Sequence, residues 1–269
     1  MKVLHIISSG GMYGAEAVIL NMSRTLNEGR HSSVLGVFAN ASNPNLQLHE
    51  RAQAEGIESN LVPCGGQIDR AAIAAIRELA IRAKVDVVHA HGYKADIYVY
   101  LALRGREMPF VSTCHTWYDN DILVRVYGIA DRFILRKYAG VVAVSDEVKQ
   151  RLLKAGVREE KISVIQNGID LRPYRGAVSS LRSELGADDA PIVGLIGRLS
   201  QEKGVDIFLR AIPGILARVP GARFVIVGDG PQRDMLEALI AELMIRGSIS
   251  MLGRRDDMPE VCASLDVMV

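Results

Sequence analysis

The sequence is poor in cysteine and in aromatic residues, and it has almost no excess charge of either sign. It contains three cysteines, Cys64, Cys114 and Cys262, none of which forms the Cys-x-x-Cys spacing of a zinc site or redox pair. A scattered, odd set of this kind excludes a disulfide framework and favours a reducing compartment. We therefore expect a cytoplasmic protein.

The near balance of charge and the short apolar runs exclude two further classes. Lys plus Arg number 32 against 31 for Asp plus Glu, which excludes the strongly basic face of a nucleic-acid-binding protein. No run approaches the roughly 18 apolar residues that a membrane-spanning helix needs. The run at residues 1–9 is too short for a signal peptide and is interrupted by His5, so it is better interpreted as a first strand.

Apolar strands alternate with helical segments along the 269 residues, a length that fits two domains of ordinary size. This alternation predicts an α/β protein with parallel sheets. The expected strands are 3–7, 33–38, 85–89, 110–114, 140–144, 163–166, 192–196, 223–227, 248–251 and 266–269. The expected helices are 15–26, 46–54, 70–84, 93–103, 121–139, 146–155, 205–217 and 232–244.

The segment Gly168–Pro191 breaks this alternation and is rich in glycine, serine and proline. We interpret it as the junction between two sheets. The predicted domains are residues 1–170 and residues 171–269.

The segment Ile192–Gly204 has the pattern of a buried strand that ends in a cationic loop. Gly197 marks the turn, Arg198 offers a planar fork of donors, and Lys203 a mobile point charge before the next helix. Such a loop, at a strand's carboxyl end and a helix's amino end, is suited to a diphosphate. The alternative is that both cations are ordinary solvated surface charges.

The loop after the first strand, residues 8–16, contains glycines at which backbone can approach a ligand closely. Gly11 and Gly14 belong to this loop. Glu16 falls in the first helical turn, where a carboxylate complements the helix dipole, so a structural role for it is as reasonable as a ligand contact.

Histidines follow two neighbouring strands. His89 and His91, two residues apart, could share a face, and His115 begins a polar-aromatic loop. Together they raise the hypothesis of a metal site, but no acidic partner is evident and a hydrogen-bonded core histidine is the better interpretation of His89. We predict no metal. His115, at a crevice position, is a candidate functional residue.

Two weaker loops complete the candidates. Gly228-Asp-Gly230 lies between a predicted strand and a helix but lacks the third glycine of a dinucleotide fingerprint, and Gly253-Arg254 follows the next strand. Each is by itself compatible with an ordinary surface turn.

Taken together, the loops resemble the retaining glycosyltransferases of family 4, in the right order along the whole chain. The segments that carry the resemblance are Gly-Gly…Gly-Ala-Glu16, His115-Thr-Trp-Tyr, Val144-Ser-Asp-Glu-Val, Ile165-Gln-Asn-Gly-Ile-Asp, Gly197-Arg-Leu-Ser-Gln-Glu-Lys-Gly, Val227-Gly-Asp-Gly-Pro and Leu252-Gly. The resemblance implies a GT-B fold, in which two Rossmann-like domains with parallel sheets face a cleft. The N-terminal domain would bind the acceptor and the C-terminal domain the nucleotide-sugar.

The resemblance also implies roles for individual residues. Arg198 and Lys203 would hold the donor diphosphate, a UDP- or GDP-sugar, without a metal, and His115 would contact the transferred sugar. Other residues would line the donor or acceptor: Gly11, Gly14, Glu16, Gly197, Gly228, Gly230, Gly253 and Arg254. No tightly bound cofactor is expected. The acceptor would be a saccharide or a lipid-linked molecule, as in cell-envelope polysaccharide synthesis.

In the family, the strand that corresponds to residues 266–269 is followed by a helix that carries two glutamates. The second domain is therefore expected to be incomplete, and the chain to be a fragment or to be completed by another chain. Two alternatives remain: a non-catalytic nucleotide-sugar-binding subunit, and an enzyme similar to nucleotide-sugar 2-epimerases. The segment Asp121–Ala139 mixes cations with apolar residues, so peripheral contact with the inner face of a membrane is a further hypothesis beside that of a half-buried helix.

Overall fold

The computed structural model describes residues 1–269 except 43–44, 67, 116–130, 132, 180 and 188. By its internal contacts the chain divides into two compact units, Met1–Ile169 and Asp170–Val269. Each unit is an α/β structure around one parallel sheet, as the alternation of strands and helices predicts.

The sheet of the first unit has seven parallel strands in the order β3-β2-β1-β4-β5-β6-β7. In this order the chain starts in the middle, moves to one edge and returns to build the other, so the direction reverses between β1 and β4. The strands are β1 (Lys2–Ile7), β2 (Ser32–Asn40), β3 (Glu58–Cys64), β4 (Val87–His91), β5 (Phe110–Cys114), β6 (Gly140–Ala143) and β7 (Ile162–Val164).

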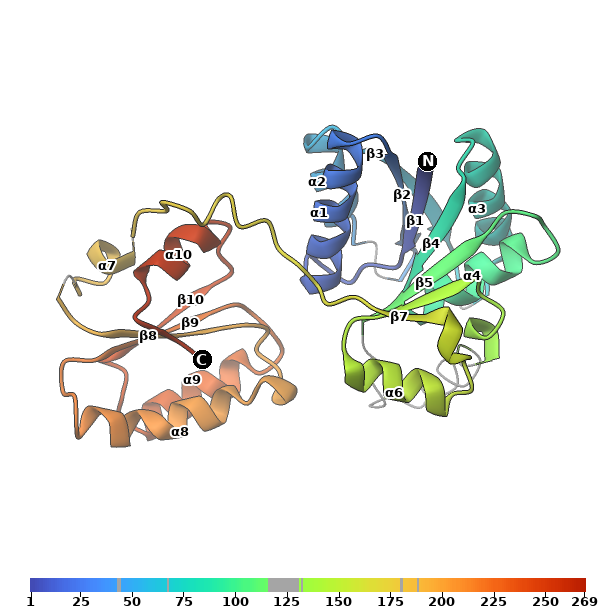
Figure 1. Cartoon of the computed structure of the whole chain (residues 1–269). Coiled ribbons are helices and arrows are strands. Elements are labelled where there is room, and N and C mark those ends of the chain that lie inside the picture. Colours follow the sequence, from blue (N-terminus) through green and yellow to red (C-terminus); the bar gives the residue numbers. More distant parts are fainter. Residues whose placement is uncertain (43–44, 67, 116–130, 132, 180, 188) are drawn as a thin grey trace. The chain divides into compact units, whose positions relative to one another are not determined.

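Helices cover both faces of this sheet (Figure 1). On one face α1 (Gly14–Glu28) and α2 (Gln47–Ala54) bury Ile19, Leu20 and Leu48 against β1 and β2. The other face carries α3 (Arg70–Arg82), α4 (Tyr93–Leu103) and α6 (Asp146–Lys154). Because both faces are covered, most residues of the inner strands β1 and β2 are buried.

Side chains start two of these helices. The Asp69 carboxylate accepts hydrogen bonds from Ala71 N and Ala72 N at the start of α3. The Ser145 hydroxyl accepts one from Val148 N at the start of α6. Both satisfy amide groups that a helix leaves without intrahelical partners in its first turn.

The second unit repeats the architecture on a smaller scale. Its sheet has the order β10-β9-β8-β11, again parallel throughout. The strands are β8 (Ile192–Ile196), β9 (Arg223–Val227), β10 (Ile249–Gly253) and β11 (Val267–Met268). Helices α8 (Val205–Leu216) and α9 (Arg233–Glu242) cover one face, and α7 (Leu181–Glu184) and α10 (Met258–Ser264) cover the other (Figure 1).

Several predicted bounds differ from the observed ones, and some elements were missed. The third expected strand, 85–89, is β4 and runs from Val87 to His91, because its pairing with β1 continues to Ile7↔His91. The strand expected at 248–251 is β10 and reaches Gly253. Edge strand β3 was missed because it has no apolar run and contains Pro63, which an edge tolerates. The short helices α7 and α10 were missed as well.

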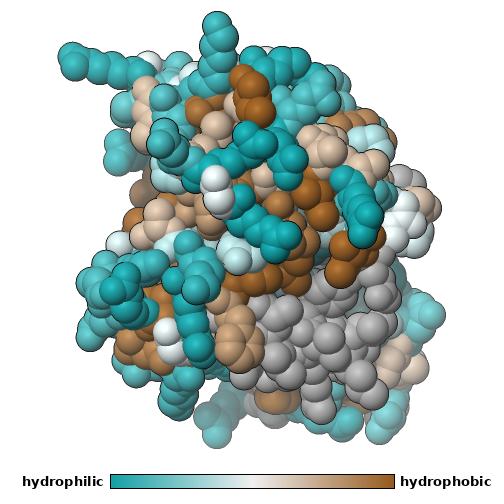
Figure 2. Space-filling model, turned by 90° about the vertical axis from the view of Figure 1, so that its right-hand side faces the viewer, coloured by the Kyte–Doolittle hydropathy of each residue, from teal (hydrophilic) through white to brown (hydrophobic). Residues whose placement is uncertain are grey.

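The cysteines and the membrane hypotheses can be checked in part. Cys64, Cys114 and Cys262 are all free thiols. No helix in the described part of the chain combines the length and the apolar composition needed to cross a bilayer. On the side that Figure 2 shows, hydrophilic side chains are interspersed with hydrophobic ones. The predicted helix Asp121–Ala139 lies largely outside the described residues, so the interfacial hypothesis stays untested.

Two glycines of the second unit provide a matched test of this packing. A Cβ on Gly194 in β8 would lie 2.5 Å from Leu265 Cδ1 and 3.2 Å from Leu265 Cγ, whereas exposed Gly214 in α8 has open space around it. Gly194→Ala should lower the free energy of unfolding by about 1–3 kcal/mol through overpacking. Gly214→Ala should raise it by about 0.5–1 kcal/mol through helix propensity. Urea unfolding followed by circular dichroism measures both, and equal effects would contradict this account of the core.

Candidate functional site

The loop after β8 lies at the position where the strand order of the second sheet reverses, between β8 and β11. Gly197 N donates a hydrogen bond to Val227 O at 2.9 Å, and the chain then forms the 3₁₀ turn Gln201–Lys203 before α8. Gly204 joins the turn to the helix with φ 60° and ψ 30°, a left-handed conformation that favours glycine. Ligands of parallel α/β sheets bind at such reversal points.

Two cations belong to this loop, and both are exposed. The methylene carbons of Lys203 lie 3.8–3.9 Å from the point that a Cβ on Gly197 would occupy, so the stem of Lys203 lies along the Gly197 backbone. The Ser200 hydroxyl donates to Glu202 Oε1 at 2.6 Å, and this bond, helped by Arg198 and Lys203, lowers the pKa of Glu202. The loop therefore carries two cations and one ionised carboxylate.

The loop after β9 packs against the loop after β8 through backbone contacts that only glycine permits. A Cβ on Gly228, whose φ is 137°, would collide with the carbonyl oxygen of Gly197, and one on Gly230 would collide with that of Leu199. Leu199 N also donates to Asp229 O at 3.1 Å. Gly228 and Gly230, the two glycines singled out in the sequence, are thus required for the packing of these loops. This packing role is compatible with a ligand contact and does not by itself indicate one.

The loop after β10 joins the same edge. Gly253, with φ 68°, accepts a hydrogen bond from Gly228 N at 2.7 Å, and Arg254 follows directly. Backbone hydrogen bonds therefore hold together the loops that contain Gly197, Gly228 and Gly253, and the structure brings all the predicted donor-side residues of the second unit to one edge of one sheet.

The predicted residues of the first unit gather at the carboxyl edge of the other sheet. After β1, Gly11 N donates to Ser9 Oγ at 3.2 Å, and Gly14 is the first residue of α1, with open space around it. Glu16 is buried, and its Oε2 accepts from Tyr13 N at 3.1 Å. This bond satisfies an amide at the start of α1, so Glu16 has a structural role as a capping residue, whereas the structural role considered from the sequence was to complement the helix dipole.

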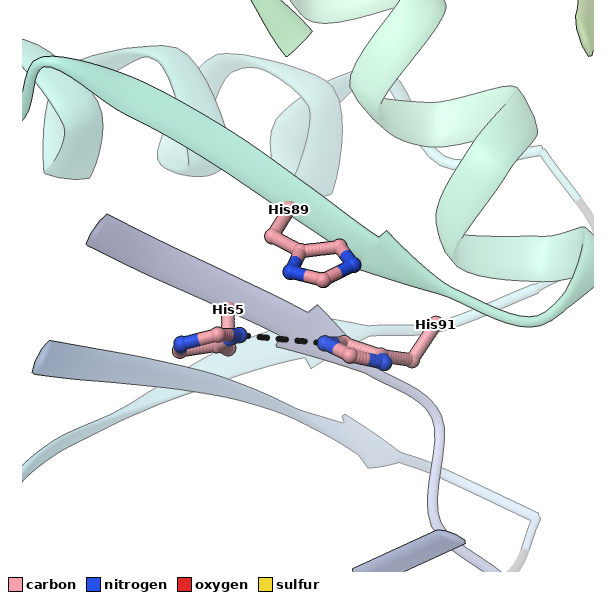
Figure 3. A group of neighbouring side chains, drawn as sticks. All are labelled: His5, His89 and His91. Carbon is pink, nitrogen blue, oxygen red and sulfur yellow. Dashed lines mark hydrogen bonds between the residues drawn. The ribbon is translucent and has the colours of Figure 1, made fainter. Parts of the chain in front are cut away.

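The parallel register places four histidines on one face of this sheet. His5 pairs with His89, Ile7 pairs with His91, and His91 pairs with Thr113, two residues before His115. His5 Nδ1 lies 3.0 Å from His91 Nε2, and His91 Nδ1 lies 3.4 Å from His115 Nε2. Figure 3 shows the His89 ring above the contact between His5 and His91.

Sequence reasoning missed His5, which it treated only as an interruption of an apolar run. In the described part of the chain, the cluster of side chains that could hold a metal ion consists of His5, His89 and His91, whose ligand atoms lie within 4.8 Å of one another. The set considered from the sequence contained His115 in place of His5. Neutral imidazoles suit zinc. However, His5 Nδ1 and His91 Nε2 already form a hydrogen bond with each other, so these two nitrogens are not free to bind a metal.

Burial keeps these imidazoles neutral. It lowers the pKa of His5 and of His91 well below the ordinary value, with neighbouring histidines adding to the effect. Burial, with a smaller contribution from His115, lowers the pKa of His89 to about 4, and burial also lowers the pKa of His115. The cause is that a charged ring loses its hydration inside the protein.

These shifts make stability depend on pH. A histidine whose pKa is depressed by folding contributes stability that is complete above the unfolded value of about 6.5 and is lost as the pH falls towards the folded value. For His89 the window is about 6.5 to 4. The free energy of unfolding should therefore fall more steeply across this window in the wild type than in His89→Gln, which cannot titrate, as measured by urea unfolding at a series of pH values. Parallel curves would contradict the shift.

Comparisons with known proteins agree with this architecture. The model of Glycosyltransferase Family 4 matches residues 12–172, and that of Glycosyl transferases group 1 matches residues 190–269. The gpi3 subunit of phosphatidylinositol N-acetylglucosaminyltransferase from Schizosaccharomyces pombe is 29% identical over 69% of this chain, and the match covers 41% of that protein. Phosphatidyl-myo-inositol mannosyltransferase from Mycolicibacterium smegmatis is 26% identical over 93% of this chain and 63% of its own length.

Solved structures show the same fold. HepE from Anabaena, crystallised with UDP-glucose, superposes with a TM-score of 0.82 at 24% identity and covers 100% of this chain and 73% of its own. A glycosyltransferase from Rickettsia africae gives a TM-score of 0.77 at 20% identity, over 99% of this chain and 72% of its own. The α/β fold with two parallel sheets is thus of the GT-B type. With more than half of its length matched by the family model, the chain belongs to glycosyltransferase family 4.

Proposed function

We propose that the protein transfers a sugar from a nucleotide-sugar donor to a saccharide or lipid-linked acceptor, with retention of the anomeric configuration. The observation that carries the donor half of the proposal is the set of three loops held together at the carboxyl edge of β8, β9 and β10. They combine close backbone approach at Gly228 and Gly230 with the exposed cations Arg198 and Lys203. A diphosphate needs both features.

The roles of the two cations follow from their chemistry. Arg198 presents a planar fork that matches two phosphate oxygens, and Lys203 adds a point charge whose position is restricted by its stem along Gly197. Both would hold the diphosphate in the ground state. They would stabilise it further as the bond between the anomeric carbon and the phosphate oxygen breaks and negative charge builds on the leaving nucleotide.

Retention would follow from attack on the face that the nucleotide leaves. The acceptor hydroxyl oxygen forms its bond to the anomeric carbon on that face, and the leaving phosphate oxygen takes the hydroxyl proton. No protein nucleophile is needed on this route, and His115 would contact the transferred sugar. Since the two loop cations neutralise the diphosphate, donor binding would not require a metal ion.

Relatives support a nucleotide-sugar donor in general terms. HepE was crystallised in complex with UDP and glucose, and also in complex with UDP-glucose. The curated relatives include a phosphatidylinositol N-acetylglucosaminyltransferase subunit, a phosphatidyl-myo-inositol mannosyltransferase and a 2-deoxystreptamine glucosyltransferase. The first two names contain lipids, which supports a lipid-linked acceptor as one part of the range that we propose.

Nucleotide binding tests the cationic loop. Titration calorimetry with UDP and with GDP should show binding by the wild type and a loss of affinity of about tenfold or more in Arg198→Ala and in Lys203→Ala, because each removes a charge-assisted contact. Arg246→Ala is the matched control, since this exposed arginine precedes β10 and lies at the amino edge of the same sheet. Wild-type binding of neither nucleotide, or equal losses in all three variants, would contradict the proposal.

The metal-independent part of the proposal has a separate test. The affinity for UDP should be the same in excess EDTA and in excess MgCl₂ or MnCl₂, because side-chain cations and not a metal bind the diphosphate. Binding that disappears with EDTA and returns with either ion would show that a metal bridges the phosphates. In that case, calorimetry on Arg198→Ala and Lys203→Ala would still show whether the two side chains bind the diphosphate.

A further inference from the structure

Three imidazoles form a continuous hydrogen-bonded chain in the first unit. It starts at His5 in β1, passes through His91 in β4 and ends at His115 after β5, with nitrogen distances of 3.0 and 3.4 Å. His5 and His91 are buried, with 0% and 4% of their surface exposed, whereas His115 is half-buried. The chain thus connects the interior of the sheet with a residue at its carboxyl edge.

The chain can carry its protons in only two uniform ways, because a neutral imidazole has one N–H donor and one acceptor nitrogen. In the first, each ring carries its proton on Nδ1, so that His5 donates to His91 Nε2 and His91 donates to His115 Nε2. In the second, each ring carries it on Nε2 and all donations run in the opposite direction. The second arrangement requires an N–H at His5 Nε2.

The buried end of the chain decides between the two. His5 Nε2 is buried and has no hydrogen-bond partner among the described residues. A buried N–H without an acceptor is rarer in proteins than an acceptor that lacks a donor. The first arrangement instead leaves the N–H of His115 Nδ1 without a partner among the described residues. The two ends differ in position, because His115 is half-buried at the carboxyl edge, where a ligand oxygen can accept this bond, whereas His5 is 0% exposed inside the sheet. The first arrangement is therefore favoured, and it leaves His115 with its proton on Nδ1.

His89 supports the middle of the chain. Its ring centroid lies 4.2 Å from that of His91, and its Nε2 lies 2.7 Å from Thr113 Oγ1. Figure 3 shows this ring against the pair formed by His5 and His91. This close, tilted ring contact restricts rotation of the His91 ring, on which both hydrogen bonds of the chain depend.

We propose that His5 and His91 are positioning residues that hold His115 in one orientation and in one neutral tautomer, with its N–H at Nδ1. His115 Nδ1 is buried and has no partner in the described part of the chain. It would therefore present a neutral donor to an acceptor oxygen, such as a sugar hydroxyl. The link to a sugar rests on the role of His115 under the proposed function, whereas the tautomer does not.

The tautomer is measured without any ligand. In protein labelled with ¹⁵N-histidine, long-range ¹H–¹⁵N spectra at neutral pH distinguish the two neutral forms, and single variants assign the signals. We expect His5, His91 and His115 all in the Nδ1–H form. The Nε2–H form at His115, or a mixture of both forms there, would overturn the proposal.

Two substitutions of His5 separate positioning from packing. His5→Phe removes the donor to His91 Nε2 and should leave His115 as a mixture of tautomers. In His5→Asn the side-chain N–H of the amide replaces the Nδ1–H group, so His115 should keep the wild-type tautomer. His31→Gln, at an exposed histidine outside the chain, is the control and should change neither. An unchanged His115 spectrum in folded His5→Phe would overturn the proposal. If His5→Phe does not fold, the spectra of the wild type and of His5→Asn still decide.

Donor affinity gives the functional readout. His5→Phe and His91→Phe should reduce the affinity for UDP-glucose about three- to tenfold and leave the affinity for UDP unchanged. If His115 shows the expected tautomer but His115→Phe binds UDP-glucose as the wild type does, the proposed sugar contact fails and the positioning stands. Stoichiometric zinc binding that His91→Phe abolishes would identify a metal site in place of the hydrogen-bonded chain and would overturn the proposal.

Discussion

Parallel strand pairing is the constraint on which the rest of this molecule depends. Since all strands of each sheet run in the same direction, their carboxyl ends meet at one edge, and the loops that leave them become neighbours although they are far apart in the sequence. Residues 11, 16 and 115 share such an edge in the first unit, and residues 198, 228 and 253 share one in the second. The chemistry of each edge is therefore assembled by the backbone before any side chain contributes.

In the second unit the backbone also sets which residues are possible. The loops after β8 and β9 approach so closely that a side chain on Gly228 or Gly230 would overlap a carbonyl oxygen. This closeness leaves amide groups and the Lys203 stem near one another at the strand ends. A polyanion bound there would meet fixed backbone dipoles together with the charges of Arg198 and Lys203.

In the first unit the same pairing creates an unusual interior. Polar rings at positions 5, 89 and 91 occupy a face that parallel sheets normally fill with aliphatic side chains. They are tolerated because the rings are neutral and are held by hydrogen bonds, between His5 and His91 and between His89 and Thr113, although His5 Nε2 has no partner among the described residues. A network of this kind specifies one arrangement of its members more strictly than an apolar core does.

The sequence by itself determined the elements whose local pattern is strong. Strands β5, β8 and β9 and helix α4 have the bounds that periodicity and glycine placement predict, and the motif order led to the family. Only the tertiary structure decided that β3 with its Pro63 is a strand, that β4 includes His91, and that His5 lies beside His89. The physical reason is that local periodicity reports which face of an element is buried, whereas neighbours and register come from hydrogen bonds between strands about eighty residues apart (Lys2–Ile7 and Val87–His91).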